Sequence, residues 1–321
     1  MTPCTRRKAL AGAAAGALAA CSRKPSGPAP LVSIVRANSY ADDLLDRIRR
    51  ILAAHKLDVR GKRVVLKPNL VEYDPGTTIN THPALVEAAL EAFRSAGAAD
   101  VRIAEGPGHR RNTLELAEQA GYFSTVPKFE ELFTDLNLDD VKRVTIAHPH
   151  SRLDALYLPA TVLACDLLVS LPKMKCHHWV GATLSMKNLF GLVPGGVYGW
   201  PKNVLHWAGI NECIADLHSL FPRTFAIVDG IVGMDGNGPI QGTPKHAGVL
   251  VAGADKVAVD ATCCRVMGIA PERVGYLQLT AGRGQLSAAN VHQIGETIRS
   301  VETTFRLIEP FRDLRLAPGS R

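Results

Sequence analysis

The sequence predicts an α/β protein in which a mostly parallel sheet is flanked by helices. Short apolar runs rich in β-branched residues alternate along the chain with segments whose apolar residues recur at helical spacing. The strand-like runs are apolar throughout, which is typical of strands covered on both faces. Such alternation favours parallel strands joined by helical crossovers. A single unit over 31–321 fits this pattern, and a division into lobes 31–165 and 166–321 with a cleft between them stays open.

Local signals define the individual elements. The clearest helix is Pro83–Ala96, with apolar residues every three or four positions, Thr81 as its expected N-cap and Gly97 at its end. The expected strands are Leu31–Ala37, Arg63–Pro68, Val101–Glu105, 143–147, Asp166–Leu171, Phe225–Val228 and Val249–Ala252. The other expected helices are Asp42–His55, 113–120, Ile210–Leu220, Lys256–Met267 and Arg273–Thr280.

Residues 1–20 have the order of parts found in a bacterial export signal. Arg6-Arg7-Lys8 forms a basic start, and an uncharged alanine-rich run follows as far as Ala20. The run is shorter than the ~20 residues that a membrane-spanning helix needs. The arginine pair resembles the twin-arginine signal, and Leu18-Ala19-Ala20-Cys21 resembles a lipoprotein cleavage site.

These resemblances imply a protein that is exported already folded to the periplasmic side of a bacterial membrane. Lipidation of Cys21 would then hold it at that membrane. Residues 21–30 have the composition of a flexible tether. The alternative is a cytoplasmic protein with an alanine-rich start.

Composition argues against several partners and cofactors. The formal charge of +7 falls to +4 without residues 1–20, because Arg6, Arg7 and Lys8 leave and no acid does. This dispersed charge does not indicate a nucleic-acid partner. The cysteines form no C-x-x-C pair, so we expect neither a structural zinc ion nor an iron–sulfur cluster of the protein's own. No glycine run matches a Rossmann or Walker loop, so a nicotinamide cofactor is not expected.

Polar residues gather where the expected strands end. Ligands of parallel α/β sheets sit beyond the carboxyl ends of the strands. One strand ends at Lys67 and Asn69, and three later strands are followed by segments 105–109, 173–178 and 229–237. We therefore expect these four segments to build one composite site. For Lys67 alone, the alternative is a surface lysine whose aliphatic stem lies along the protein surface while its ammonium group stays in water.

The segment from Ser170 to Gly196 has the strongest site signal. It contains Lys173, Lys175 and Lys187 but no carboxylate, although a desolvated ammonium group needs a counter-charge. In an extended segment Lys173, Lys175 and His177 share one face, which suits a small anion such as a carboxylate or phosphate. A lysine among other cations has a lowered pKa, so Lys187 could act as a base or nucleophile beside Asn188. The alternative is a solvated sheet edge.

Three further positions have balanced interpretations. His109 lies in a Gly-Pro-Gly turn that could equally be a plain surface loop. His206 could be a satisfied core histidine. Asp229 precedes a glycine-rich segment, 234–239, expected to be a flexible loop; its carboxylate could pair with the lysines or bind a cation, and the alternative is a tight structural turn.

These motifs resemble those of the family catalogued as domain of unknown function 362, over roughly residues 60–295. The family has no general assigned reaction, and this chain lacks the ferredoxin-type cysteine clusters of some members. The matching motifs are Lys67-Pro68-Asn69-Leu70-Val71, Thr81-His82-Pro83, Leu171-Pro172-Lys173-Met174-Lys175, Met186-Lys187-Asn188-Leu189-Phe190-Gly191, Val228-Asp229-Gly230-Ile231, Gly236-Asn237-Gly238-Pro239 and Asp255-Lys256-Val257-Ala258-Val259-Asp260.

A remoter resemblance is to the nickel-pincer lactate racemases. It rests on Gly108-His109-Arg110, His177, Lys187, Val193-Pro194-Gly195 and His206 in that order. The resemblance implies that Lys187 anchors a pincer-type cofactor, that His177 and His109 exchange protons, and that His206 lies on the metal side. The residues before Lys187 are Ser185-Met186, where the racemases have a glycine pair.

The combined hypothesis is an enzyme that binds a small anionic carboxylate substrate and transfers a proton next to the carboxylate, as racemases and epimerases do. Lys187, His177 and His109 are the expected catalytic residues. The expected substrate-binding residues are Lys67, Asn69, Lys173, Lys175, Asn188 and Asp229. A metal or nickel-pincer cofactor is one option. A non-catalytic periplasmic binding or cofactor-carrying protein, and a redox partner, remain alternatives.

Overall fold

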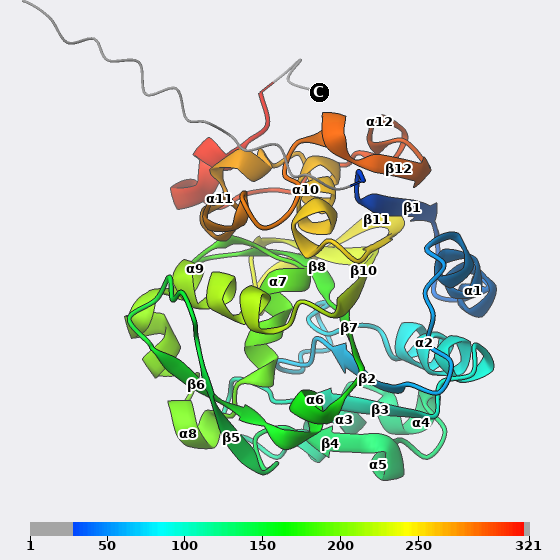
Figure 1. Ribbon diagram of the computed structural model, residues 1–321. Helices are drawn as coiled ribbons and strands as arrows, with labels where there is room; N and C mark the ends of the chain where they lie inside the picture. Colours follow the sequence, from blue (N-terminus) through cyan, green and yellow to red (C-terminus); the bar gives the residue numbers. More distant parts are fainter. Residues whose placement is uncertain (1–27, 318–321) are drawn as a thin grey trace, which may run out of the picture.

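The computed structural model describes residues 28–317, which build a ten-stranded mixed sheet covered by helices (Figure 1). Its strand order is β12-β1-β11-β10-β7-β2-β3-β4, with β8 and β9 attached beside β10. The predicted α/β class is therefore confirmed. The strands are β1 Leu31–Arg36, β2 Arg63–Pro68, β3 Asp100–Glu105, β4 Phe133–Asp135, β5 Val141–Thr145, β6 Ala155–Pro159, β7 Leu167–Leu171, β8 Lys173–His177, β9 Gly181–Thr183, β10 Thr224–Asn237, β11 Gln241–Gly253 and β12 His292–Gly295.

Most pairs of neighbouring strands run parallel. The series β10-β7-β2-β3-β4 is parallel throughout, and β8 pairs parallel to β10. The exceptions are β11, which lies antiparallel to both β1 and β10, and β9, which lies antiparallel to β8. Since β2, β3 and β8 point the same way, the segments that follow them meet at one edge of the sheet.

Helices cover both faces of the sheet (Figure 1). Val64 and Leu66 of β2 pack into a core with α1, α2 and α3, whereas Val65 points into the opposite core with α9, α10 and α11. This alternation is the two-residue period of a strand buried on both faces. The helices are α1 Leu44–Ala54, α2 Pro83–Ser95, α3 Thr113–Gln119, α4 Tyr122–Thr125, α5 Phe129–Leu132, α6 Ala160–Ala164, α7 Ser185–Asn188, α8 Gly195–Tyr198, α9 Asn203–Leu220, α10 Lys256–Val266, α11 Gly275–Thr280 and α12 Ile298–Val301.

Three local expectations are corrected. Segment 234–239, expected to be a flexible loop, is for the most part strand, because β10 continues to Asn237 and pairs with β11 and β8. The expected strand 143–147 is β5, which pairs with β6 in a separate two-stranded sheet. The N-cap of α2 is His82, whose ring accepts from the Ala84 N–H. The hydroxyl of Thr81 instead donates to the carbonyl of Leu171.

The export signal and Cys21 lie outside residues 28–317, so the structure does not describe them. Within the described range, none of the helices has both the length and the apolar character that crossing a bilayer requires.

Candidate functional site

A cavity of about 400 Å³ lies at the edge of the sheet where β2, β3 and β8 end. This volume falls in the range of small-molecule sites. Seven of the residues singled out in the sequence line it together: Asn69, His109, Lys175, His177, Lys187, Asn188 and His206. Three others, Lys67, Lys173 and Asp229, are fully buried and lie outside the lining.

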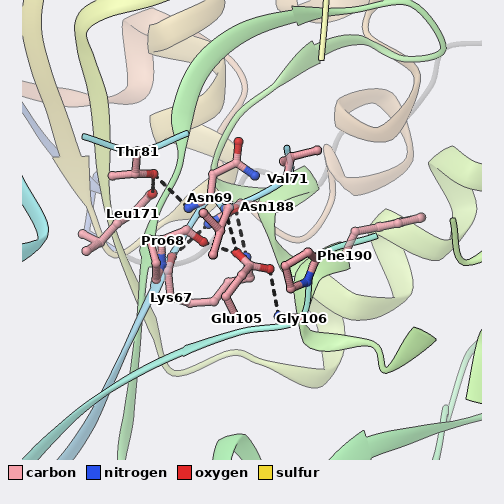
Figure 2. A network of polar contacts seen from close by, with 12 residues as sticks. Lys67, Pro68, Asn69, Val71, Thr81, Glu105, Gly106, Leu171, Asn188 and Phe190 are labelled. Carbon is pink, nitrogen blue, oxygen red and sulfur yellow. Dashed lines mark hydrogen bonds and ion pairs between the residues drawn. The ribbon is translucent and has the colours of Figure 1, made fainter. Parts of the chain in front are cut away.

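Lys67 is buried beneath the cavity in an ion pair with Glu105 (Figure 2). Its ammonium group also donates to the Asn188 side chain at 3.1 Å and to the Pro68 carbonyl at 2.8 Å. The Glu105 carboxylate accepts in addition from the backbone N–H groups of Leu70 and Gly106. This network joins the ends of β2 and β3 to α7 and leaves the Glu105 charge already paired.

Lys173 belongs to a second buried ion pair, with Asp229 at 2.6 Å. The hydroxyl of Tyr40 donates to Asp229 at 2.8 Å, and the Lys173 ammonium donates to Tyr40 and to the Val232 carbonyl. Neither charge reaches the cavity. Burial lowers the pKa of Lys173, while Asp229 acts in the opposite direction.

The short helix α7 carries Lys187 and Asn188 and is held by Asp260. The Asp260 carboxylate accepts from the backbone N–H groups of Ser185 at 2.8 Å and Met186 at 3.0 Å. These are helix N-terminal donors that no backbone carbonyl within the helix can satisfy. Burial raises the pKa of Asp260 to about 7, against the lowering effect of these hydrogen bonds.

Lys187 has an unusual environment for an ammonium group. Its Nζ lies 3.9 Å from the centroid of the Phe190 ring. Residues 28–317 give it neither a hydrogen bond nor an ion pair. Burial and, to a smaller extent, repulsion from Lys67 lower the pKa of Lys187 to about 7. At neutral pH a large share of this amine is therefore unprotonated and can accept a proton.

Lys175 and Lys202 are the other cations on the cavity lining. Lys175 donates to the carbonyls of Ile79 at 2.9 Å and Pro239 at 3.4 Å. Lys202 donates to the carbonyls of Gly106 at 2.6 Å and Phe190 at 2.8 Å. Burial lowers the pKa of Lys202 to about 7 and that of Lys175 well below its usual value. Neither ammonium group has a carboxylate within ion-pairing distance among residues 28–317.

Two histidines on the lining have defined tautomers. His177 Nδ1 accepts from the Trp179 N–H at 3.0 Å, so its neutral ring carries the proton on Nε2. His206 Nδ1 lies 3.0 Å from the Lys202 carbonyl and donates to it, so its Nε2 is the acceptor. Burial, with repulsion from Lys187, lowers the pKa of both rings. His109 lines the rim of the cavity.

Two polar atoms on the lining have no partner in the part of the chain that the structure describes. Asn69 Oδ1 and Thr183 Oγ1 are buried and form no hydrogen bond there. Buried polar groups are usually satisfied, so orphans beside a cavity point to a polar group that enters it.

The described residues do not form a metal site from protein ligands. No three His, Cys, Asp or Glu side chains between residues 28 and 317 are placed so that they could hold an ion together. The rings nearest His206 are Trp179 at 4.6 Å and Phe190 at 5.7 Å between centroids. The donor set of this cavity is ammonium groups and neutral rings, and it suits an anion better than a cation.

Sequence reasoning missed Lys202 and Thr183, and it named Glu105 only as part of a strand end. Lys202 lies in a loop rather than after a strand, so the strand-end rule could not select it. Its backbone has a φ of 66°, a left-handed conformation that is uncommon for a lysine. The hydrogen bonds of its buried ammonium group hold it there.

Comparison with known proteins gives the family. The chain is 28% identical over 293 residues to a thylakoid-associated protein of Synechocystis sp., covering 87% of this chain and 84% of that protein. The lactate racemase apoprotein from Thermoanaerobacterium thermosaccharolyticum is a structural match with a TM-score of 0.47 and 15% identity, covering 75% of this chain; the match spans 57% of that structure. The family model described as Domain of unknown function (DUF362) matches residues 64–265, most of the chain, so the protein belongs to that family.

Proposed function

We propose that the cavity binds a small organic anion with a carboxylate group and that Lys187 exchanges a proton with the bound molecule. One observation carries this proposal: Lys175, Lys187 and Lys202 line a single cavity, and the only carboxylate that residues 28–317 contribute to its lining, Glu105, is already paired with Lys67. The ammonium groups of Lys175 and Lys202 are buried, and that of Lys187 is partly buried. Burying such a charge without a counter-charge is costly, and an anionic ligand supplies that charge.

The count of N–H donors supports an anion of this size. An ammonium group has three N–H donors, and Lys175 and Lys202 each use two of them in hydrogen bonds to backbone carbonyls. Each therefore keeps one for a ligand, and the Lys187 donors are unused. Two ammonium groups that each offer one N–H match the two oxygens of a carboxylate.

The orphan polar atoms extend the proposal to the rest of the ligand. Asn69 Oδ1 and His206 Nε2 are acceptors on the lining, so a hydroxyl or amino group next to the carboxylate has partners there. The Phe190 and Trp179 rings offer apolar surface to the remaining part. Hydroxy and amino carboxylates are therefore the substrate class we favour.

Proton transfer follows from the position of Lys187. The C–H bond next to the carboxylate breaks, and its proton moves to the neutral Nζ of Lys187. The electron pair delocalises into the carboxylate, where the ammonium groups of Lys175 and Lys202 offset the added charge. Return of a proton to the face of the carbon that lost it restores the molecule. Delivery to the opposite face of that carbon inverts the centre.

Hydrogen exchange tests this proposal. The protein is incubated in deuterated water with a panel of small 2-hydroxy and 2-amino carboxylates, and loss of the C2 proton is followed by NMR. We expect exchange with at least one compound, its loss in Lys187→Met, and its retention in Lys142→Met, which removes an exposed lysine. Binding without exchange would support the carrier alternative, and no binding of any carboxylate would overturn the anion site itself.

We also propose that the protein is exported and tethered through Cys21, with residues 31–321 as one folded unit. The signal-like residues 1–20 support export, and the name of the thylakoid-associated relative is compatible with a location at a membrane. The neighbouring positions of β1 and β12, from opposite ends of this segment, support a single unit.

A further inference from the structure

A second cavity, of about 910 Å³, lies on the opposite edge of the sheet, where the parallel strands begin. Its lining includes Leu31 at the start of β1, Pro222 just before β10, and Asp255, which follows the antiparallel β11. The carboxylate cavity described above lies where the parallel strands end, so the two cavities share no lining residue.

Basic side chains gather in this second cavity. Lys256 is buried, with 2% of its surface exposed, and its ammonium group donates to the Phe221 carbonyl at 2.7 Å. Residues 28–317 give Lys256 no ion pair within 4 Å. The guanidinium of Arg283, on an exposed residue, donates to the hydroxyl of Ser219, and its other N–H groups form no hydrogen bond with residues 28–317. Two cations therefore line the cavity with donors to spare.

His218 provides an independent sign of a ligand. The side chain is 9% exposed and lines the cavity, and its Nδ1 is buried without a hydrogen-bond partner among residues 28–317. Burial and repulsion from Lys256 and Arg283 lower the pKa of His218 to about 3, so both cations lie close to a neutral ring. An unsatisfied buried nitrogen beside two cations lacks a polar partner that a ligand could supply.

The carboxylate on the lining is Asp255, and its oxygens are already used. Oδ1 accepts from the N–H groups of Val257 and Ala258, and Oδ2 accepts from the Gln285 N–H. Asp255 therefore caps the N-terminus of α10 and holds the backbone at Gln285. It forms an ion pair with neither Lys256 nor Arg283. The spare donors of these two residues are therefore available to a ligand.

We propose that this cavity binds a phosphate monoester, with Lys256 and Arg283 contacting the phosphate oxygens and His218 contacting a hydroxyl of the phosphate or of its organic part. Arg and Lys together with a neutral histidine are a donor and acceptor set that suits phosphate. The volume exceeds the need of a bare phosphate, and the side chains of Leu31, Ile146 and Leu220 give an organic part apolar surface. This site is independent of the proposed function at the first cavity.

Titrations with inorganic phosphate and glycerol 3-phosphate, followed by calorimetry, test the site. We expect Arg283→Gln to weaken binding of the ester about tenfold or more, since it removes a charge-assisted contact. Because Arg283 is exposed, this variant should fold. Arg299→Gln, which removes another exposed arginine, and Lys187→Met, which alters the first cavity, should both bind as the unmodified protein does.

The ¹⁵N resonance of His218 Nδ1 gives a direct readout, because a hydrogen bond to the ligand shifts it. Lys256→Met is a second variant and should abolish that shift. Phosphatidylcholine vesicles with and without phosphatidic acid distinguish the source of the phosphate: capture by the acidic vesicles alone assigns a lipid headgroup, and binding of the soluble ester assigns a free metabolite. Phosphate binding that Lys187→Met abolishes and Arg283→Gln leaves intact would overturn the proposal, as would no binding of any of these probes.

Discussion

The Lys187 amine lies 3.9 Å from the centroid of the Phe190 ring and forms no hydrogen bond with residues 28–317. The ring attracts a cation only weakly compared with the water that the amine has lost. Burial therefore dominates and brings the pKa of Lys187 to about 7. Protonated, this amine can bind an anion in the cavity. Unprotonated, it can act as a base toward a C–H bond of the bound molecule.

Anion binding should take up protons. The lysines of the cavity have lowered pKa values, and a bound negative charge raises them again. A carboxylate should therefore bind more weakly as pH rises from about 6 to 8, because Lys187 and Lys202 lose their protons over this window. Calorimetry in two buffers of different ionisation enthalpy measures the protons taken up. Lys187→Met should reduce that number, and an unchanged number in this variant would contradict our assignment.

Loss of the Glu105 charge should destabilise the fold strongly. Glu105→Gln leaves the buried ammonium group of Lys67 without its counter-charge, which should lower the free energy of unfolding by roughly 3–5 kcal/mol. Urea denaturation measures this change. The matched control is Glu91→Gln, which breaks an exposed pair with Arg94 and should cost less than about 0.5 kcal/mol. Equal effects of the two substitutions would contradict the structural role of the buried pair.

Gly191 should tolerate no side chain. A Cβ at this position would overlap the Glu105 carboxylate and the Lys67 ammonium group. Gly191→Ala should therefore lower the stability by roughly 1–3 kcal/mol and weaken ligand binding, since the pair lies under the cavity. Gly282→Ala is the control, because nothing lies within 4 Å of the added carbon. Thermal unfolding of both variants makes the comparison, and a neutral Gly191→Ala would show that the pair can move aside.

The sequence placed Lys175 and His177 together because both lie in the segment that directly follows the apolar strand β7. Lys175 and His177 alternate along β8 and both line the cavity, as an extended segment requires. Lys173 is also two residues from Lys175 along β8, but its ammonium charge is paired with the carboxylate of Asp229, which lies 56 residues further along the chain. That pairing depends on the register between β8 and β10, which local patterns do not contain.

The glycines in and directly after β10 were misread as flexibility. A Cβ at Gly233 would press on the Met174 carbonyl, and one at Gly238 would overlap the Cys176 carbonyl. These glycines let the backbone of β8 approach closely. Close approach and loop flexibility use the same residue type, so only the three-dimensional neighbours distinguish them. The strand β5 was found, but its polar residues Lys142 and Arg143 suit the exposed two-stranded sheet that it forms with β6.

Cys21 should determine where the protein is found in the cell. If it is lipidated after export, the protein should fractionate with membranes, and Cys21→Ser should move it to the soluble fraction. Cys165→Ser, which changes a partly buried thiol of the folded part, is the control and should stay with the membranes. Mass spectrometry of the mature N-terminus checks the modification directly. An unmodified chain that still begins at Met1 would contradict the export interpretation.

Asp260 should make stability fall as pH rises from about 4 to 7. The folded protein holds the Asp260 proton up to about pH 7, while the unfolded chain releases it near the ordinary value of 3.8. In this window the folded state binds more protons, so raising the pH favours unfolding. The shift from 3.8 to about 7 limits the change to roughly 4 kcal/mol.

The measurement is the free energy of unfolding in urea at several pH values between 4 and 8. The side chain of Asp260→Asn cannot ionise, so the free energy of unfolding of this variant should fall less steeply with pH. The variant also loses an acceptor for the Ser185 or Met186 N–H. Asp154→Asn, which changes a carboxylate whose side chain is 88% exposed, should keep the slope of the unmodified protein. Parallel curves for Asp260→Asn and the unmodified protein would mean that the N-terminal N–H groups of α7 keep the Asp260 carboxylate ionised despite its burial.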